Sequence, residues 1–363
     1  MKKWLETRQV LDRLAELRSE GRRAALATVV RVRGSAYRHE GAKMLVAKDG
    51  SVVGNVSGGC LEADVREVAL RVLETGVSEQ REYCGSADEI EAWDLGVGCE
   101  GVVDVSVQRA ALSVQGDDTW AAVRRLLDAE EGFVWCADIV AQHAMVVTAS
   151  TVTGTLGATV VDAAVVAHAR DVLGGASGMA TVAGREVFFD VFEPPPQLLV
   201  VSAGDDVMPL ARTAADVGFR VVIADRRPAL LTRARFPGAQ RLVEVDATTL
   251  VELVASRGEC YAVVMSHNYA DDRAYLRALL DSRAMYIGML GPRQRTERML
   301  AELSAEGPVD ESRVYGPVGL DIGTDGAEQV ALAVIGEILA VRSGRSPTSL
   351  RERQAPIHAG TTD

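Results

Sequence analysis

Apolar residues recur at helical and strand spacings along most of this chain of 363 residues. In residues 4–18 they lie three and four positions apart, which predicts an amphipathic helix. The segment AALATVVRVRGS, residues 24–35, is rich in β-branched residues and predicts a strand. AKMLVAKDGSVVGNV, residues 42–56, predicts a hairpin that turns at Asp49-Gly50, and residues 61–74 predict a second helix.

The middle of the chain continues this mixture of helices and strands. Four further strands are predicted around residues 102–107, 132–140, 144–148 and 186–192, and two helices near 118–128 and 162–173. We find no internal repeat and no low-complexity tract in the sequence. The pattern leaves the order of the strands in this region open.

A run of three prolines in FEPPPQLLVVSAG marks a boundary, because polyproline is a stiff spacer that continues neither a helix nor an inner strand. Beyond it, strands alternate with helices: strands at 198–201, 220–224, 262–266 and 284–290, and a helix at 206–217. Such alternation predicts a doubly wound parallel sheet. We therefore expect an α/β protein with three parts: an N-terminal α/β domain (1–193), a C-terminal Rossmann-like domain (194–345) and a tail (346–363).

Composition narrows the class of protein. The net charge of −12, from 39 basic and 51 acidic residues, argues against a broad nucleic-acid or anionic-membrane surface. The five cysteines form no CxxC pair, which argues against structural zinc and suits reduced thiols. The N-terminus lacks the apolar core of a signal peptide, and no window has 18 uncharged apolar residues. These features predict a cytoplasmic protein without a membrane span.

The stretch VVSAGDDVMPLARTAADVGFRVVIADRR resembles a nucleotide-binding turn. Asp225 lies 21 residues after Gly204, a spacing that suits a carboxylate on a ribose hydroxyl and a phosphate at the helix start. Ser202, however, replaces the first glycine of the fingerprint, and Asp205 and Asp206 would repel a pyrophosphate. Two interpretations stay open: a dinucleotide site, or a degenerate turn kept for architecture.

Two further motifs follow strands of the predicted sheet. In YIGMLGPRQRTERML, Gly291 precedes Arg293, Arg295 and Arg298 at a helix start, a pattern that predicts an anion cradle or else a solvated basic face. His267 follows the strand AVVMS at the same edge. It is a candidate acid/base or orienting group, or a hydrogen-bonded structural residue.

Cysteine supplies the remaining candidates. Gly58 and Gly59 expose the backbone, and Cys60 stands at the start of the predicted helix 61–74, where a thiolate is favoured. The alternative is a small buried apolar residue. Cys99, in the turn GVGCEGVVDV, is the second candidate. We expect the other three cysteines to be structural: Cys84, Cys136 and Cys260.

The motifs RGSAYRHEGAKMLV, GNVSGGCLEADV and VGCEGVVDV together resemble the N-terminal domain of the xanthine dehydrogenase accessory protein family, of the XdhC/CoxI type. PPPQLLVVSAGDDVMPLARTAADVGFRVVIADRRP, SHNYADD, YIGMLGPRQR and GPVGLDIGTDGAEQVALAVIGEILAVR resemble its C-terminal Rossmann-like domain. The resemblance runs from about residue 24 to residue 342. Tyr37 stands where many relatives have proline, a change that we expect to alter only loop stiffness.

The resemblance implies a chaperone for the molybdenum cofactor (molybdopterin) rather than an enzyme. Such a protein protects the cofactor, assists its sulfuration by a cysteine desulfurase and delivers it to a molybdenum hydroxylase of the xanthine dehydrogenase or carbon monoxide dehydrogenase type. A homodimer is common in this family. On this interpretation Cys60 would contact molybdenum through the cofactor, because the metal is sulfur-seeking. Gly204 and the arginine turn 293–298 would hold the phosphate end, with one ligand in a cleft between the domains.

The alternative is an NAD(P)-dependent oxidoreductase that uses the Rossmann-like domain, with His267 as its acid/base group. The spacing of Asp225 favours this alternative. The degenerate glycine turn and the Gly-Gly-Cys helix start favour the chaperone. Binding of NAD, NADP and the molybdenum cofactor would distinguish the two functions.

Overall fold

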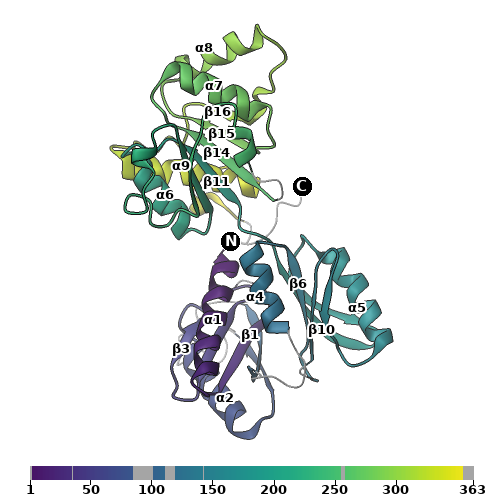
Figure 1. The fold of residues 1–363 in the computed structure, drawn as a ribbon. Coiled ribbons are helices and arrows are strands. Elements are labelled where there is room, and N and C mark those ends of the chain that lie inside the picture. Colours follow the sequence, from purple (N-terminus) through teal and green to yellow (C-terminus); the bar gives the residue numbers. More distant parts are fainter. Residues whose placement is uncertain are drawn as a thin grey trace. The chain divides into compact units, whose positions relative to one another are not determined.

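The computed structural model describes residues 2–34, 36–84, 101–110, 119–141, 143–254 and 258–354. The chain divides into two compact units, an N-terminal unit that ends at Pro194 and a C-terminal unit that begins at Pro195 (Figure 1). Each unit is described by itself. The predicted α/β class is confirmed, with a parallel six-stranded sheet in the C-terminal unit.

The first half of the N-terminal unit is one antiparallel sheet with two helices. Its elements are α1 (Lys2–Ser19), β1 (Ala24–Arg33), β2 (Lys43–Ala47), β3 (Val52–Gly54), α2 (Glu62–Thr75), β4 (Glu79–Cys84) and β5 (Val102–Arg109). The strand order is β3-β2-β1-β5-β4, and all neighbours are antiparallel. Both predicted helices and the predicted hairpin are present.

The second half repeats this plan. Its elements are α4 (Thr119–Ala129), β6 (Phe133–Asp138), β7 (Ala144–Val147), β8 (Val152–Gly154), α5 (Thr159–Val172), β9 (Gly178–Val182) and β10 (Arg185–Phe192). The strand order is β8-β7-β6-β10-β9, again antiparallel. Within the described residues, each half is thus a helix, three strands, a helix and two strands, with the same order in its sheet.

The expectation of no internal repeat was therefore wrong. The register agrees in detail, since Met44 pairs with Gly54 in one half and Met145 with Gly154 in the other. Both glycines have positive φ, +80° and +90°, and a Cβ at either would collide with a backbone carbonyl of the neighbouring strand. The repeat is hidden in the sequence because it preserves backbone geometry and burial far more than residue identity.

Hydrophobic cores hold the two halves together. Helix α2 covers one face of the first sheet, and α5 covers one face of the second (Figure 1). The remaining faces pack with α1 and α4 into a core that both halves share, with Leu26 and Leu45 from the first sheet and Val146 and Phe192 from the second. The two sheets therefore meet through their inner faces.

The C-terminal unit is a six-stranded parallel sheet between two layers of helices. Its elements are β11 (Gln197–Val201), α6 (Val207–Asp216), β12 (Arg220–Asp225), η1 (Pro228–Leu230), β13 (Arg241–Glu244), η2 (Leu250–Leu253), β14 (Cys260–Val264), α7 (Tyr269–Leu280), β15 (Tyr286–Met289), α8 (Arg293–Ser304), η3 (Glu311–Arg313), β16 (Val314–Tyr315), α9 (Ala327–Ser343) and η4 (Leu350–Glu352). The strand order β13-β12-β11-β14-β15-β16 is that of a Rossmann-type sheet.

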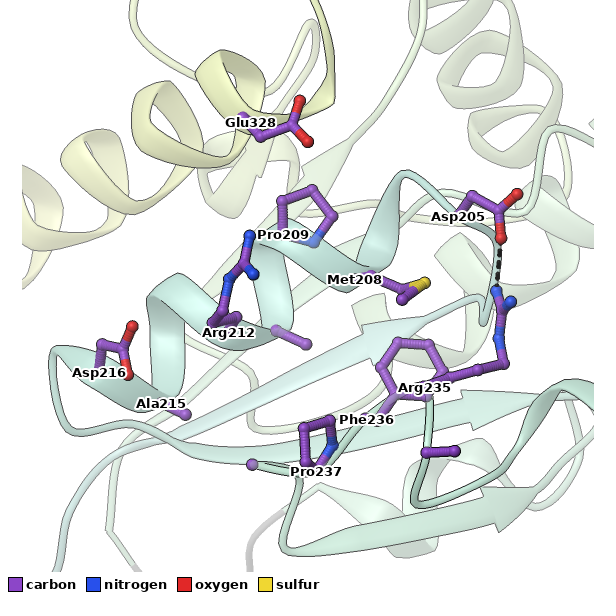
Figure 2. A pocket seen from close by; sticks show the side chains of 13 residues that line it. Asp205, Met208, Pro209, Arg212, Ala215, Asp216, Arg235, Phe236, Pro237 and Glu328 are labelled. Carbon is purple, nitrogen blue, oxygen red and sulfur yellow. Dashed lines mark hydrogen bonds and ion pairs between the residues drawn. The ribbon is translucent and has the colours of Figure 1, made fainter.

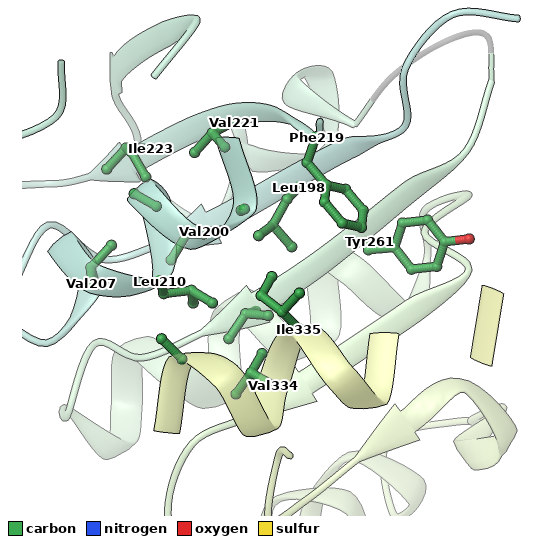
Figure 3. Close-up of a cluster of buried hydrophobic side chains, with 14 of the residues drawn as sticks. Leu198, Val200, Val207, Leu210, Phe219, Val221, Ile223, Tyr261, Val334 and Ile335 are labelled. Atoms are coloured by element: carbon green, nitrogen blue, oxygen red, sulfur yellow. The ribbon is translucent and has the colours of Figure 1, made fainter. Parts of the chain in front are cut away.

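Both faces of this sheet are covered. Helices α6 and α9 pack on one face, where Leu198 and Val200 of β11 meet Val334 and Ile335 of α9 (Figure 3). Helices α7 and α8 pack on the other face. The strand order reverses between β11 and β14, so the carboxyl ends of these two strands form the edge at which ligands bind in open α/β sheets. In the described ranges, no helix is both long and apolar enough to cross a membrane.

Candidate functional site

The glycine turn between β3 and α2 is organised around the hydroxyl of Ser57. Its Oγ accepts hydrogen bonds from the backbone amides of Gly59 and Leu61, each at 3.1 Å, and Cys60 Sγ lies 3.6 Å from the same oxygen. Helix α2 begins at Glu62, with Leu61 as its N-cap. Cys60 therefore stands immediately before the cap, close to its predicted place.

Glu62 closes this turn from the helix side. Its carboxylate accepts hydrogen bonds from the amides of Val56 (3.1 Å) and Ser57 (2.8 Å) and from the Ser57 hydroxyl. Burial alone would raise the pKa of Glu62, but the hydrogen bonds from Ser57 and Val56 outweigh it and hold that pKa below its ordinary value. The backbone donors around Ser57 are thus paired within the turn, while Gly58 and Gly59 remain exposed.

An exposed aromatic ring lies against this turn. Tyr37 is 67% exposed, and a Cβ placed on Gly58 would lie 3.4 Å from its ring. Gly59 has φ of +119°, and a Cβ there would meet nothing within 4 Å. The half-buried thiol of Cys60 is therefore accompanied by open backbone and by a flat ring. From its motif we expected Tyr37 to alter only the stiffness of its loop, and the contact of its ring with this turn was not predicted.

The second repeat provides an internal reference for this turn. At the start of α5, Asp162 Oδ1 accepts the amide of Leu156 at 2.8 Å, as Glu62 accepts that of Val56. The hydrogen bond from a backbone amide to a carboxylate in the first turn of the helix is therefore a feature of both repeats. The residue that corresponds to Cys60 is Val160, because both lie two positions before the carboxylate. The Gly-Gly-Cys sequence belongs to the first repeat alone.

The other cysteines are placed as follows. Cys99 lies outside the described residues. Cys136 and Cys260 are buried, and Cys84, which we expected to be structural beside apolar runs, is exposed at the end of β4. All four described cysteines are free thiols. The described part of the chain contains no group of three or more His, Cys, Asp or Glu side chains that could hold a metal ion.

In the C-terminal unit, the turn after β11 is occupied by its own side chains. The Ala203 amide donates to Asp225 Oδ2 at 2.6 Å, and the Gly204 amide donates to Ser202 Oγ at 3.2 Å. These are backbone donors that a nucleotide phosphate would need. The serine that replaces the first glycine of the fingerprint thus fills part of the phosphate position.

The carboxylate of Asp225 is also fully hydrogen bonded within the chain. It is 4% exposed, and Arg227 donates to both of its carboxylate oxygens, at 3.0 and 2.8 Å. Burial would raise the pKa of Asp225, but the hydrogen bonds from Arg227 and from the Ala203 amide outweigh burial and hold it below its ordinary value. This carboxylate anchors the turn rather than facing solvent as a free ribose acceptor.

His267 meets the same turn from the end of β14. Its Nε2 lies 2.8 Å from Asp206 Oδ2, and its ring is exposed. The backbone at His267 has φ of +60°, a left-handed conformation that costs free energy in a residue with a Cβ. This pair spans the point where the strand order reverses. Asp206, which the sequence suggested only as a source of repulsion, is the partner of His267.

In the arginine turn after β15, two of the three arginine side chains already pair with carboxylates of the chain. Arg295 pairs with the buried Asp272 at 2.6 Å, and Arg298 pairs with Glu302 at 3.0 Å. Arg293 is exposed at the start of α8, and its guanidinium has no ion pair or hydrogen bond to any described residue. Within this turn, which opens at Gly291, Arg293 is the cation that remains available to a ligand.

Comparison with known proteins matches both units. Residues 17–84 match the XdhC and CoxI family, and residues 198–338 match the XdhC Rossmann domain. Over 340 residues the chain is 33% identical to a Bacillus subtilis (strain 168) protein named as a probable xanthine dehydrogenase subunit, with 92% of this chain and 96% of that protein covered. The chain belongs to the XdhC and CoxI family.

Further relatives of this XdhC-family chain include a named chaperone and a solved structure. The molybdenum cofactor insertion chaperone PaoD of Escherichia coli (strain K12) is 24% identical over 338 residues, with 92% of this chain and 88% of that protein covered. A crystal structure of a xanthine dehydrogenase from Bacillus halodurans superimposes with a TM-score of 0.75 at 25% identity, over 96% of this chain and 98% of that one. The resemblance seen in the sequence motifs is confirmed.

The structure of this XdhC-family chain also contains a pocket that the motifs did not indicate. It has a volume of about 590 Å³ and lies along α6, beside the turn that contains Asp205 (Figure 2). Arg235 pairs with Asp205 at 2.8 Å at one end, and Phe236 and Pro237 line its apolar side. The sequence analysis gave Arg235 and Phe236 no functional role. The pocket becomes visible only because the structure places these two residues beside α6.

Proposed function

We propose that this protein binds the molybdenum cofactor, protects it, assists its sulfuration and delivers it to a molybdenum hydroxylase of the xanthine dehydrogenase type. Membership of the XdhC and CoxI family supports this maturation role, as does the similarity to a molybdenum cofactor insertion chaperone. The observation that carries the proposal is the accessible thiol of Cys60 beside bare glycine backbone and an exposed tyrosine ring.

The Cys60 turn suits the metal end of the cofactor. A thiol is a soft donor of the kind that suits a sulfur-bound metal, and Gly58 and Gly59 leave room for a bulky ligand to approach the backbone. Tyr37 adds a flat apolar surface next to the thiol. We include Cys99 as a second thiol of this site, on the sequence argument alone. When bound, the cofactor supplies the molybdenum chemistry; these residues hold and shield it.

The carboxyl edge of the parallel sheet suits the anionic end. Arg293, which has no partner among the described residues, supplies the free positive charge, with Gly291 giving access to the start of α8. The guanidinium of Arg295 already pairs with Asp272, so Arg295 contributes to this site only indirectly. Gly204, Asp225 and His267 shape the neighbouring turn. In this arrangement Arg293 can pair with a single phosphate. The glycine turn after β11, which a dinucleotide would need, is not free.

The NAD(P)-dependent oxidoreductase is less well supported by this geometry. The amides of Ala203 and Gly204 and the carboxylate of Asp225 are already paired within the chain. We therefore propose no redox role for the Rossmann-like unit. Calorimetry with NAD and NADP tests this directly: micromolar binding of either nucleotide would contradict it.

The proposal includes three macromolecular contacts: the apoenzyme of a molybdenum hydroxylase, a cysteine desulfurase that provides sulfur, and a second copy of this chain. Each can be tested by mixing the purified proteins and measuring complex formation by light scattering. Either a xanthine dehydrogenase or a carbon monoxide dehydrogenase apoenzyme satisfies the chemistry. Activation of one apoenzyme and not the other by the loaded protein would identify the recipient.

The deciding experiment is purification from cells that make the cofactor, followed by measurement of molybdenum and of pterin fluorescence. We expect both to co-elute with the parent protein and to fall at least several-fold in Cys60→Ser. Cys84→Ser is the matched control, because Cys84 is another cysteine of the same unit that forms no disulfide, and it is more exposed than Cys60. Equal retention by Cys60→Ser and Cys84→Ser would remove Cys60 from the site.

A further inference from the structure

A small cavity that is lined by several polar side chains lies between the inner faces of the two repeated sheets. On the first sheet, Thr28 of β1 is in register with Lys43 of β2 and with Ser106 of β5. On the second sheet, Trp135 of β6 is in register with Asp190 of β10. These two rows face each other, because Lys43 pairs with Asp190. All five side chains line the cavity, which belongs to no site described above.

Two charged side chains line the cavity, the ammonium of Lys43 and the carboxylate of Asp190, and a second ammonium, that of Lys3, contacts Asp190 without lining the cavity. Lys43 and Asp190 are each 1% exposed, and a second lysine, Lys3, also pairs with Asp190. Lys43 Nζ donates further to the carbonyl of Gly41 at 3.0 Å, and Lys3 Nζ to that of Val191 at 2.7 Å. Burial lowers the pKa of Lys43, while the two lysines hold the pKa of Asp190 below its ordinary value against the opposing effect of burial. One carboxylate faces two ammonium groups.

Two polar groups of the cavity lining have no partner among the described residues. Ser106 Oγ and Trp135 Nε1 are buried without a hydrogen bond, in residues that are 2% and 6% exposed. An indole N–H can only donate, and the carboxylate that lines this cavity is already saturated by Lys3 and Lys43. Buried polar groups left unpaired are costly, and each one calls for an unseen partner. The missing partner must therefore accept hydrogen bonds.

We propose that this cavity binds one small monovalent anion of the size of chloride, held by the ammonium of Lys43, the hydroxyl of Ser106 and the indole N–H of Trp135. A negative charge balances the second lysine and supplies the acceptor that both unpaired donors lack. The free volume of about 10 Å³ is close to that of one water molecule. Sulfate and phosphate are far larger than this volume, so among anions only a single-atom species comes close to it. The site is independent of the proposed function.

Bromide is the probe, applied to the full-length protein. Crystals grown in sodium bromide should give an anomalous peak in the cavity, near Lys43 and Ser106. In solution at constant ionic strength, replacing gluconate by chloride should raise the melting temperature along a saturating curve, as expected for a ligand of the native state. Ser106→Ala should weaken this chloride dependence by about tenfold in apparent Kd, because it removes a hydrogen bond to an anion.

Ser78→Ala is the matched control. Ser78 Oγ is also buried and unpartnered among the described residues but does not line the cavity, so this variant should keep the full chloride dependence. Trp135→Phe should behave as Ser106→Ala does. The bromide experiment needs no variant, so poor folding of Trp135→Phe leaves the test intact. A water molecule in place of bromide, or equal chloride dependence of Ser106→Ala and Ser78→Ala, would overturn the proposal.

Discussion

Glu62 and Asp162 occupy the same position in the two repeats of the N-terminal unit. Each stands in the first turn of its helix, and each accepts a hydrogen bond from the amide six residues before it, Val56 or Leu156. The shared contact shows what the repeat needs in order to fold. What differs at this turn is the Gly-Gly-Cys sequence, to which the proposed function gives a role in cofactor binding.

Glu62→Ala and Asp162→Ala should both destabilise the protein. Each removes hydrogen bonds that satisfy backbone donors at a helix entry, so each should lower the free energy of unfolding by about 1–2 kcal/mol. Urea denaturation measures this. Only Glu62→Ala should also reduce cofactor retention, since only its turn bears Cys60. A loss of retention in Asp162→Ala of the same size would refute this separation.

The stabilisation by Glu62 should depend on pH in a definite direction. Its pKa in the folded protein lies below the ordinary value of 4.5, so the folded state binds the proton less readily than the unfolded state. Its contribution is complete above about pH 4.5 and is lost as pH falls through the folded value. The difference in stability between the parent and Glu62→Gln should therefore shrink on acidification, and a constant difference would contradict this.

Tyr37→Ala should reduce cofactor retention, whereas Tyr37→Phe should preserve it. The ring packs on Gly58 and is otherwise exposed, so its flat surface matters more than its hydroxyl. Molybdenum content and pterin fluorescence of the purified variants test this. Because the side chain is largely in solvent, the unfolding free energy should change by less than about 0.5 kcal/mol. Loss of retention in both variants would instead implicate the hydroxyl.

His267→Gly should stabilise the C-terminal unit or leave it unchanged, although it removes the contact with Asp206. Glycine adopts φ of +60° without penalty, which should return about 1 kcal/mol of backbone strain, while the exposed pair contributes little. His267→Ala keeps the strain and should be the less stable variant. If His267 serves the cofactor, both variants lose retention; a stable variant with full retention would exclude that role.

Asp225→Ala should act on stability rather than on nucleotide affinity. It leaves the Ala203 amide unpaired and removes the partner of Arg227, so we expect a loss of about 2–4 kcal/mol in unfolding free energy. Chemical denaturation measures the loss. Arg227→Ala is the companion variant and should cost less, because its guanidinium is half exposed. A stable Asp225→Ala variant that had merely lost NAD binding would favour the oxidoreductase.

Most helices and strands of this fold are predictable from the hydrophobic pattern. The parallel strands are nearly continuous apolar runs, such as LLVV in β11, because they are buried on both faces. The pattern missed β4, β9 and β13, whose residues are mostly exposed or half exposed, and β8 and β16, which have three and two residues. For these strands, pairing with a neighbour decides the structure, and no local signal marks it.

The candidate site was predictable in its parts but not in its contacts. Spacing located Cys60 before a helix and His267 after a strand. Spacing could not show that Asp225 would turn inward to hold Ala203, because that depends on Ser202 and Arg227 closing the turn around it. The same holds for Tyr37, since its position over Gly58 follows from the path of a long loop.

The duplication inside the N-terminal unit has a consequence for how such a protein can specialise. In an assembly of two identical chains, any thiol placed at one helix entrance appears at both. Here the two entrances are encoded separately, so one carries cysteine and the other carries valine on the same support. A tandem chain can therefore differ at two equivalent helix starts, and the thiol at the start of α2 has no counterpart at the start of α5.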